Sequence, residues 1–481
     1  MKISTTPTTG TSFLHTYAFE ITLFILSIIL TVTSLNYPFY WDNVAQLSVP
    51  ANWYYDTNFT HFYVPDHMAT GHPTFIGMYF AALWKIFGKS LVVSHLAMLP
   101  FVFGLACQIY KLCTNLKITK QHGVIITCFI LSDATLLSQM SLITFEVIHL
   151  FFYLLCINSI LKDNKTTLAI AFTCLVLVSL RATICGGGVM LFHFLYHYSK
   201  TKKIAIKPFL PYIFGITAIV LFLLFFYLNK GWIVHNTVSN TWKESAEYAS
   251  FTEILRNTGL FIWRLIDFGR VFIFIVFGFF LLSIVKSKHI FPKSAQPLLL
   301  LILSQFIVFF PIIVIYKNPF GHRYLLPVII PVIILTVLWV LHFKKWKRTV
   351  LTLSYICLIS GHFWLYPPKI SQGWDATTLH WNYYTVRSEM IDFIQLNQFN
   401  PQTTGSFFPN AKSFKLIDLS SEDIGFKHAE IEKDDYILFS NAFNVSDEII
   451  DTLQDQNTWS PVKTFERNRI YMTLYKRNHE N

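Results

Sequence analysis

Eleven apolar runs, each long enough to cross a lipid bilayer, constrain the fold of this chain more than any other feature of its sequence. A helix needs roughly 17–25 apolar residues to cross about 30 Å of hydrocarbon. The composition agrees, because 53% of the 481 residues are hydrophobic and 14% are charged. The runs cover residues 17–35, 90–110, 122–139, 142–160, 167–181, 183–199, 208–228, 269–286, 295–316, 324–342 and 349–366. The sequence therefore predicts an α-helical polytopic membrane protein with about 11 transmembrane helices and additional juxtamembrane helices.

The charges divide the chain into two parts. Residues 1–367 carry 27 Lys and Arg against 11 Asp and Glu, whereas residues 368–481 carry 11 against 16. We therefore expect a basic transmembrane domain over 1–367 and a small, soluble α/β domain over 368–481. In the second part, the residue pattern predicts helices over 388–396 and 448–453 and strands over 436–440 and 470–476.

The distribution of basic residues predicts the orientation of the chain. Lys and Arg gather in five short loops, with Asp163 as the one acidic residue among them, and such loops face the cytoplasm. The five loops cover residues 111–120, 162–165, 200–207, 286–293 and 344–348. The first large loop, 36–88, faces outward, and its apolar run 73–87 is too short to span and lies along the membrane surface. The prediction is a multi-pass protein of the inner (plasma) membrane with a cytoplasmic N-terminus and an extracytoplasmic C-terminus.

Ionisable and polar residues at the outer ends of these runs are the candidate functional residues. An ionisable residue at membrane depth is costly, so a functional role is its default interpretation. In the first loop, Asp42 lies among many aromatic residues, a setting that suits work on a sugar; it could instead cap a surface helix that starts near Asn43. The candidate set is Asp42, His72, Glu146, Arg181, Arg264, Arg270, His322, Arg323 and Tyr324.

The order of these motifs resembles the integral-membrane glycosyltransferases of superfamily C. The pattern is similar to the lipid-linked-sugar transferases related to protein O-mannosyltransferases (glycosyltransferase family 39) and aminoarabinose transferases. The matching features extend over about 370 residues. They are the Asp42 after the first span, Gly71-His72-Pro73 before a short surface helix, Glu146 at the start of a middle span, Leu180-Arg181, and Arg323-Tyr324-Leu325-Leu326-Pro327. The chain departs from the family in having Asp42-Asn43 where Asp-Glu is common, and His72-Pro73-Thr74 where Lys-Pro-Pro or His-Pro-Pro is common.

The resemblance implies an enzyme that transfers a hexosyl or pentosyl group from a polyprenyl-phosphate carrier to an acceptor on the outer face. The acceptor is a glycan, a lipid or a protein. Asp42 would be the general base that takes the proton of the acceptor hydroxyl. A guanidinium binds two phosphate oxygens at once, so Arg323, assisted by His322 and Tyr324, would bind the departing phosphate.

Each of the other candidates has a purely structural alternative. Arg323 and Tyr324 could anchor a helix at headgroup depth, and Glu146 could simply pair with Arg181. Arg264 and Arg270 flank Asp267 at three-residue spacing, so an ion-pair ladder on one helix face explains them as well as phosphate binding does.

The sequence establishes no cofactor and leaves a divalent cation open. The first loop contains His61, Asp66, His67 and His72, but their spacing matches no metal-binding signature, so roles in solvent or in contact with substrate are favoured. The expected partners are the polyprenyl-phosphate-linked sugar, its acceptor and the lipid bilayer, and no nucleic acid. The alternative functions are an oligosaccharide polymerase or ligase, a polyprenyl-lipid or sugar transporter, and a structural scaffold.

Overall fold

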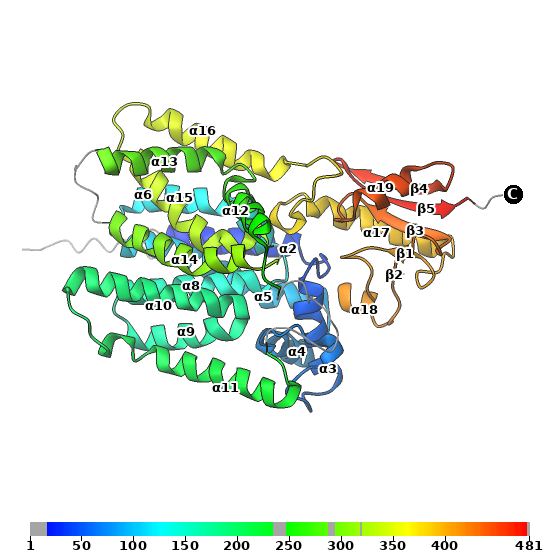
Figure 1. Cartoon of the computed structure of the whole chain (residues 1–481), viewed down its shortest axis with the longest axis horizontal. Coiled ribbons are helices and arrows are strands. Elements are labelled where there is room, and N and C mark those ends of the chain that lie inside the picture. Colours follow the sequence, from blue (N-terminus) through cyan, green and yellow to red (C-terminus); the bar gives the residue numbers. More distant parts are fainter. Residues whose placement is uncertain (1–16, 234–246, 287–293, 318–319, 479–481) are drawn as a thin grey trace, which may run out of the picture.

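Long apolar helices run side by side, and a small sheet domain sits at one end of them (Figure 1). This computed structural model describes residues 17–233, 247–286, 294–317 and 320–478. The helices of the membrane part are α2 (Ala18–Thr33), α3 (Val49–Asp56), α4 (Phe75–Phe87), α5 (Leu91–Asn115), α6 (Lys120–Leu131), α7 (Ala134–Met140), α8 (Phe145–Leu161), α9 (Lys165–Val178), α10 (Leu180–Thr201), α11 (Tyr212–Lys230), α12 (Phe251–Ile266), α13 (Val271–Lys286), α14 (Ala295–Ile315), α15 (Leu326–Leu341) and α16 (Lys347–Ser360).

Every predicted apolar run contains a helix, but the number of complete spans is not settled by these helices. Four described segments are long and apolar enough to cross a membrane by themselves: α5, α11, α14 and His322–Leu341. Two further pairs pass the same test together, although α6 and α7 meet at 77° and α12 and α13 at 101°, which makes up to six spans. The count of eleven therefore stays a prediction.

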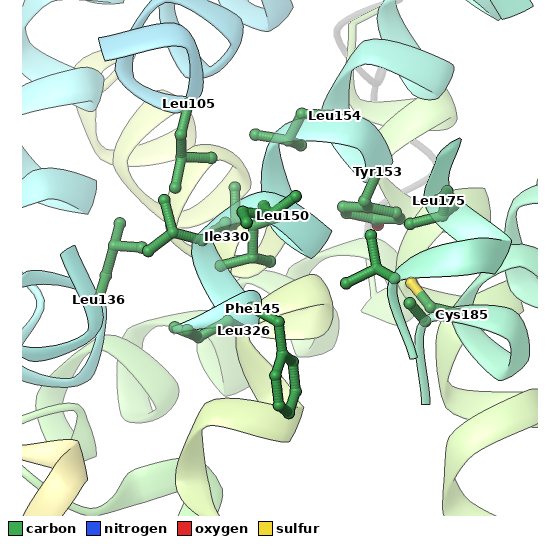
Figure 2. Packing of buried hydrophobic residues seen from close by; sticks show 14 of the residues in the cluster. Leu105, Leu136, Phe145, Leu150, Tyr153, Leu154, Leu175, Cys185, Leu326 and Ile330 are labelled. Carbon is green, nitrogen blue, oxygen red and sulfur yellow. The ribbon is translucent and has the colours of Figure 1, made fainter. Parts of the chain in front are cut away.

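Helix α15 lies at the centre of the membrane part. Nearly all of its residues are buried, and it is apolar on every side, as expected for a helix surrounded by other helices. Figure 2 shows Leu326 and Ile330 of α15 close to Leu150 of α8, within a core of interlocking apolar side chains. Because α15 is fixed on all sides, the short 3₁₀ turn η5 (His322–Leu325) that precedes it is held in a defined position.

The C-terminal part is a five-stranded mixed sheet with strand order β2-β1-β3-β5-β4. Its elements are α17 (His380–Leu396), β1 (Gly405–Ser406), α18 (Phe414–Ile417), β2 (Lys427–His428), β3 (Tyr436–Ser440), α19 (Asp447–Gln454), β4 (Trp459–Arg467) and β5 (Ile470–Arg477). The predicted helices and strands are confirmed, although α17 begins eight residues before the predicted 388. Strand β4 was not predicted from the sequence. Most of its residues are exposed, so the strand has no alternating apolar pattern.

The aromatic residues of the first loop hold the sheet domain against the helices. Tyr40 is buried in the core of the sheet domain, where its ring stacks on His380 of α17 with 5.6 Å between centroids. Trp41 packs edge-on against Phe408 at 4.9 Å. These rings were expected to suit a sugar; two of them instead form the interface between the two parts of the protein.

A sharp bend between α12 and α13 carries a buried ion pair. At the bend Gly269 has a φ of +81°, and a Cβ there would lie 2.1 Å from the Cys357 carbonyl oxygen of α16, so glycine is required. The next residue, Arg270, is fully buried and binds Asp133 at 2.6 Å and 2.8 Å. The alternative of an ion-pair ladder of Arg264, Asp267 and Arg270 on one helix face is wrong, because α12 ends at Ile266 and the backbone turns before Arg270.

This pair generates a stability prediction. We expect Arg270→Met to destabilise the protein by about 3–5 kcal/mol, because it leaves the Asp133 carboxylate buried without its partner. The double variant Arg270→Met/Asp133→Asn should recover part of the loss, since no charge then stays buried. Arg467→Ala is the control, because its pair with Glu389 is exposed and contributes about 0–1 kcal/mol. Thermal unfolding of the detergent-solubilised protein measures all three, and a melting temperature of Arg270→Met equal to that of the control would contradict the expectation.

Candidate functional site

One guanidinium, that of Arg323, joins three carboxylates from distant parts of the chain. It lies in η5 and is buried. Its Nη2 is 2.5 Å from Oδ2 of Asp42, its Nε is 3.5 Å from Oε1 of Glu146, and its Nη1 pairs with Asp375. The structure therefore brings together Asp42, Glu146 and Arg323, as the sequence predicts, and adds Asp375.

Helix N-termini position the second ion pair of the cluster. Glu146 lies in the first turn of α8, where Thr144 caps the helix, and a carboxylate is favoured at this end of a helix dipole. Arg181 lies in the first turn of α10, which Ser179 caps. The Nη1 of Arg181 binds Oε1 of Glu146. The pairing considered for Glu146 from the sequence is present, within a larger network.

Tyr324 supports both guanidinium groups. The guanidinium carbon of Arg181 lies 3.4 Å from the centre of the Tyr324 ring, and that of Arg323 lies 5.0 Å from it. The Nη2 of Arg323 also donates a 3.3 Å hydrogen bond to the Tyr324 hydroxyl. Cation–π contacts of this kind hold guanidinium planes in place. The Arg323 side chain is 6% exposed and faces carboxylates, which disfavours the alternative of an Arg–Tyr anchor at headgroup depth.

Asp42 is the most accessible carboxylate of the cluster. Its side chain is 16% exposed, against 2% for Glu146 and 4% for Asp375. It does not cap the following π-helical turn η1 (Val44–Ser48), whose N-cap residue is Asn43 and which has no side-chain cap. The preceding Trp41 has a φ of +56°, an uncommon conformation for a residue with a large side chain. The chain is thus held in an uncommon backbone conformation one residue before Asp42.

Asp375 reaches the cluster from the segment that leads into the sheet domain. It lies in the turn η7 (Trp374–Ala376), and its carbonyl oxygen accepts hydrogen bonds from Ser138 and Gln139 of α7, both 2.7 Å long. The sequence analysis missed this residue. No local pattern marks it, because its proximity to Arg323 depends on how the sheet domain docks; the nearest signal is an acidic residue beside Trp374 just after the last span.

His72 lies beside the cluster and is neutral at pH 7. Burial and the nearby Arg181 guanidinium lower the pKa of His72 to about 4, against the opposing effect of Glu146. Its Nδ1 accepts a long 3.4 Å hydrogen bond from the Leu180 backbone N–H. The ring proton of the neutral form is therefore on Nε2. His72 offers an uncharged N–H donor rather than a positive charge.

A second polar network lies next to the first. Nε2 of His322 is 2.7 Å from Oδ2 of Asp267, whose other oxygen accepts a hydrogen bond from the Tyr366 hydroxyl. Asp267 was not among the predicted site residues. In contrast, the donors of Arg270 are directed to Asp133, Thr135 and the Arg264 carbonyl, so Arg270 has a structural role.

Arg264 is the unpaired cation of this region. It lies in the last turn of α12, and its guanidinium carbon is 4.7 Å from the centre of the Phe320 ring. Its charge interacts with those of Arg323 and Asp267 at longer range. With the residues that the structure describes, its guanidinium makes no hydrogen bond or ion pair.

No group of three or more His, Cys, Asp or Glu side chains is arranged to hold a metal ion within the described ranges. The candidate residues of the first loop have other contacts. Asp66 is 3.0 Å from Nζ of Lys230, and the ring of His61 packs on Trp53. At the charge cluster, the Arg323 guanidinium occupies the position between the three carboxylates.

Comparisons with known proteins identify the fold. No protein-family model matches this chain, and no curated protein matches its sequence. Among solved structures, it is similar to ArnT from Cupriavidus metallidurans, an aminoarabinose transferase whose crystal structure contains undecaprenyl phosphate. The TM-score is 0.51 at 9% identity, and the match covers 95% of this chain and 98% of ArnT. The predicted resemblance to the aminoarabinose transferases is confirmed at the level of the fold.

The neutral His72 generates a prediction about pH. Because its pKa is lower in the folded protein than the value of about 6.5 in an unfolded chain, its contribution to stability is complete above pH 6.5 and is lost as the pH falls toward 4. We expect the Tm to fall less between pH 7 and pH 5 in His72→Gln than in the wild type. The same substitution at the exposed His428 is the matched control. Equal falls in His72→Gln and the wild type would show that His72 is not held neutral.

Proposed function

We propose that this chain, which has the fold of the superfamily C glycosyltransferases, transfers a sugar from a polyprenyl-phosphate carrier to an acceptor on the outer face of the membrane. The single observation that carries the proposal is the Arg323 cluster. An accessible carboxylate, two further acids and two guanidinium groups meet at the end of the helices, next to a soluble domain. A reaction on a lipid headgroup needs its catalytic groups at this depth. ArnT, with the same fold, binds undecaprenyl phosphate.

Asp42 is the proposed general base. It accepts the proton of the acceptor hydroxyl while the oxygen attacks the anomeric carbon and the bond from that carbon to the phosphate oxygen breaks. Glu146 and Asp375 are almost completely buried and held in ion pairs, so they are poorly placed to act as a second nucleophile. A single displacement follows, and it inverts the anomeric centre.

Arg264 is the proposed first contact of the donor phosphate. The cluster of Asp42, Glu146, Asp375, Arg181 and Arg323 carries a formal charge of −1, which opposes the approach of an anion. Arg264 is the neighbouring cation without an acidic partner among the described residues, so it can bind phosphate without breaking an existing ion pair.

In this proposal, Arg323 couples departure of the phosphate to proton transfer onto Asp42. As the carbon–oxygen bond breaks, the phosphate gains a second negative charge and competes with the carboxylates for this guanidinium. Each hydrogen bond that Arg323 transfers to the phosphate weakens its hold on Asp42. A carboxylate released from a cation is a stronger base, so departure of the phosphate promotes proton transfer to Asp42.

The remaining candidates have supporting roles in this proposal. Arg181 balances the charge of Glu146 and, through Tyr324, keeps Arg323 in position. His72 donates its Nε2–H to a hydroxyl of the sugar or to a phosphate oxygen. Asp267 holds His322 in a fixed tautomer. We further propose that the N-terminus is cytoplasmic, which puts this site and the C-terminal domain outside.

The rival functions explain the cluster less well. A transporter needs polar groups near the middle of the membrane, whereas these charges gather at the ends of helices. A scaffold needs no accessible carboxylate beside buried ion pairs. A polymerase or ligase would keep its key Arg residues in a large late loop rather than pair one of them with an Asp after the first span.

Replacement of the proposed base tests the reaction. We expect Asp42→Asn to slow transfer from a polyprenyl-phosphate sugar by about 10²- to 10⁴-fold while donor binding is retained. Asp56→Asn is the control in the same loop, since the Asp56 side chain is exposed and pairs with Lys415. Sugar transfer is measured with radiolabelled donor in proteoliposomes. Undiminished turnover in Asp42→Asn would remove Asp42 from the mechanism.

Replacement of Arg264 tests phosphate binding separately. Loss of a charge-assisted hydrogen bond costs about 1.5–3 kcal/mol, so Arg264→Ala should bind polyprenyl phosphate roughly 10- to 150-fold more weakly. Arg264→Lys should recover part of the affinity, because the bidentate contact is lost. Arg256→Ala is the control, as Arg256 is exposed on the same helix. If Arg264→Ala and Arg256→Ala bind the lipid equally well, Arg264 has no role at the phosphate.

A further inference from the structure

A polar cleft of about 490 Å³ lies between the sheet domain and the segment that connects it to α16. Its size is within the range of roughly 300–1,000 Å³ that is usual for small-molecule sites. Its walls combine aromatic and polar side chains. They include Tyr366 and Trp374 of the connecting segment, and Asn444, Glu466, Arg469 and Tyr471 of the sheet domain.

The cleft adjoins the two polar networks of the candidate active site. The hydroxyl of Tyr366 donates to Asp267 in the second network. Trp374 immediately precedes Asp375, which pairs with Arg323. A molecule bound in the cleft would therefore lie against one residue that contacts Asp267 of the second network and one that directly precedes Asp375 of the charge cluster.

The turn between β4 and β5 presents an arginine where glycine is favoured. The two turn residues, Asn468 and Arg469, have φ values of 49° and 65°, as a type I′ turn requires, and the preferred sequence of such a turn is Asn-Gly. A residue with a large side chain is strained in this conformation. The strain is retained at a position whose side chain lines the cleft, and strained residues concentrate at functional sites.

The charges of the cleft disfavour an anionic ligand. Lys369 is already paired with Asp451 at 2.8 Å. The other charged residues of the lining are Arg469, Glu466 and Asp447, so the cleft has no excess of positive charge. Glu466 lies opposite Tyr471 in the strand register, which puts an acceptor beside an aromatic ring on one wall. Aromatic faces together with carboxylate, amide and guanidinium groups match the apolar faces and hydroxyl edges of sugars.

We propose that this cleft binds an uncharged saccharide and holds the acceptor next to the reaction centre, with Arg469 as a main contact. The role of the bound saccharide as acceptor rests on the proposed function. Saccharide binding in the cleft can be measured without any turnover. An acceptor glycan held there would meet the transferred sugar at the end of the cleft nearest Asp375.

Arg469→Gly tests the assignment without the usual risk of unfolding. Glycine is the residue that the turn favours, so this variant should be at least as stable as the wild type. The full-length protein in nanodiscs is applied to an array of uncharged oligosaccharides, anionic oligosaccharides and unglycosylated peptides. Binding is measured in the Asp42→Asn background, so that no product forms. The matched control is Arg467→Ala, two residues away and outside the cleft lining.

We expect binding to uncharged oligosaccharides that is weakened by about tenfold or more in Arg469→Gly and unchanged in Arg467→Ala. Binding to peptides or anionic glycans alone, no binding at all, or equal binding by the two variants would overturn the assignment. If the oligosaccharides bind as expected but the wild type transfers nothing from polyprenyl-phosphate donors, the cleft stands and the proposed function fails. If transfer occurs and Arg469→Gly leaves the KM for the acceptor unchanged, the function stands and the cleft assignment fails.

Discussion

The ion pairs of Arg323 connect the parts of this protein. Its guanidinium holds a carboxylate from the first loop, one from the start of α8 and one from the entrance to the sheet domain. A buried guanidinium is costly to desolvate, and removal of any one carboxylate would leave that cost less well compensated. The three segments are therefore coupled through one charge. The same contacts that fix Asp42 in position also fix the sheet domain above the helices.

In the proposed function, a site with excess negative charge acts on a phosphate-linked sugar, and the cluster offers a physical account of how it would do so. Three carboxylates face two guanidinium groups. A third guanidinium, that of Arg264, lies apart, beside the ring of Phe320. This arrangement separates binding from chemistry. In the proposed reaction, the incoming monoanion would bind Arg264 alone, whereas the dianion that forms at bond cleavage would compete for Arg323. This competition would weaken the ion pair between Arg323 and Asp42 when a base is required. Before bond cleavage the donor would not bind Arg323, so the enzyme would not bind the ground state too tightly.

The sequence predicts some parts of this site and not others, for physical reasons. Asp42, Glu146 and Arg323 could be predicted because a charge at the end of an apolar run is costly, and such a position can be recognised from the sequence alone. Asp375 could not, since its role depends on the docking of a separate domain. Arg270 was misassigned because three-residue spacing implies one helix face, and a bend at Gly269 removes that condition. The helices were predictable from apolar length, whereas exposed β4 had no pattern to recognise.

The contacts of two aromatic residues in the first loop bear on where the proposed acceptor would bind. Tyr40 is buried against His380, so its ring is not available as a sugar-binding surface in this conformation, and Trp41 packs against Phe408. The proposal accordingly assigns acceptor recognition to another surface, the cleft beside the sheet domain. Because Tyr40 is part of the core of that domain, any displacement of the domain shifts the residue two positions before Asp42. In the proposed reaction, the domain that binds the acceptor would therefore also control where Asp42 lies, and an acceptor that seats the domain correctly would align the reaction.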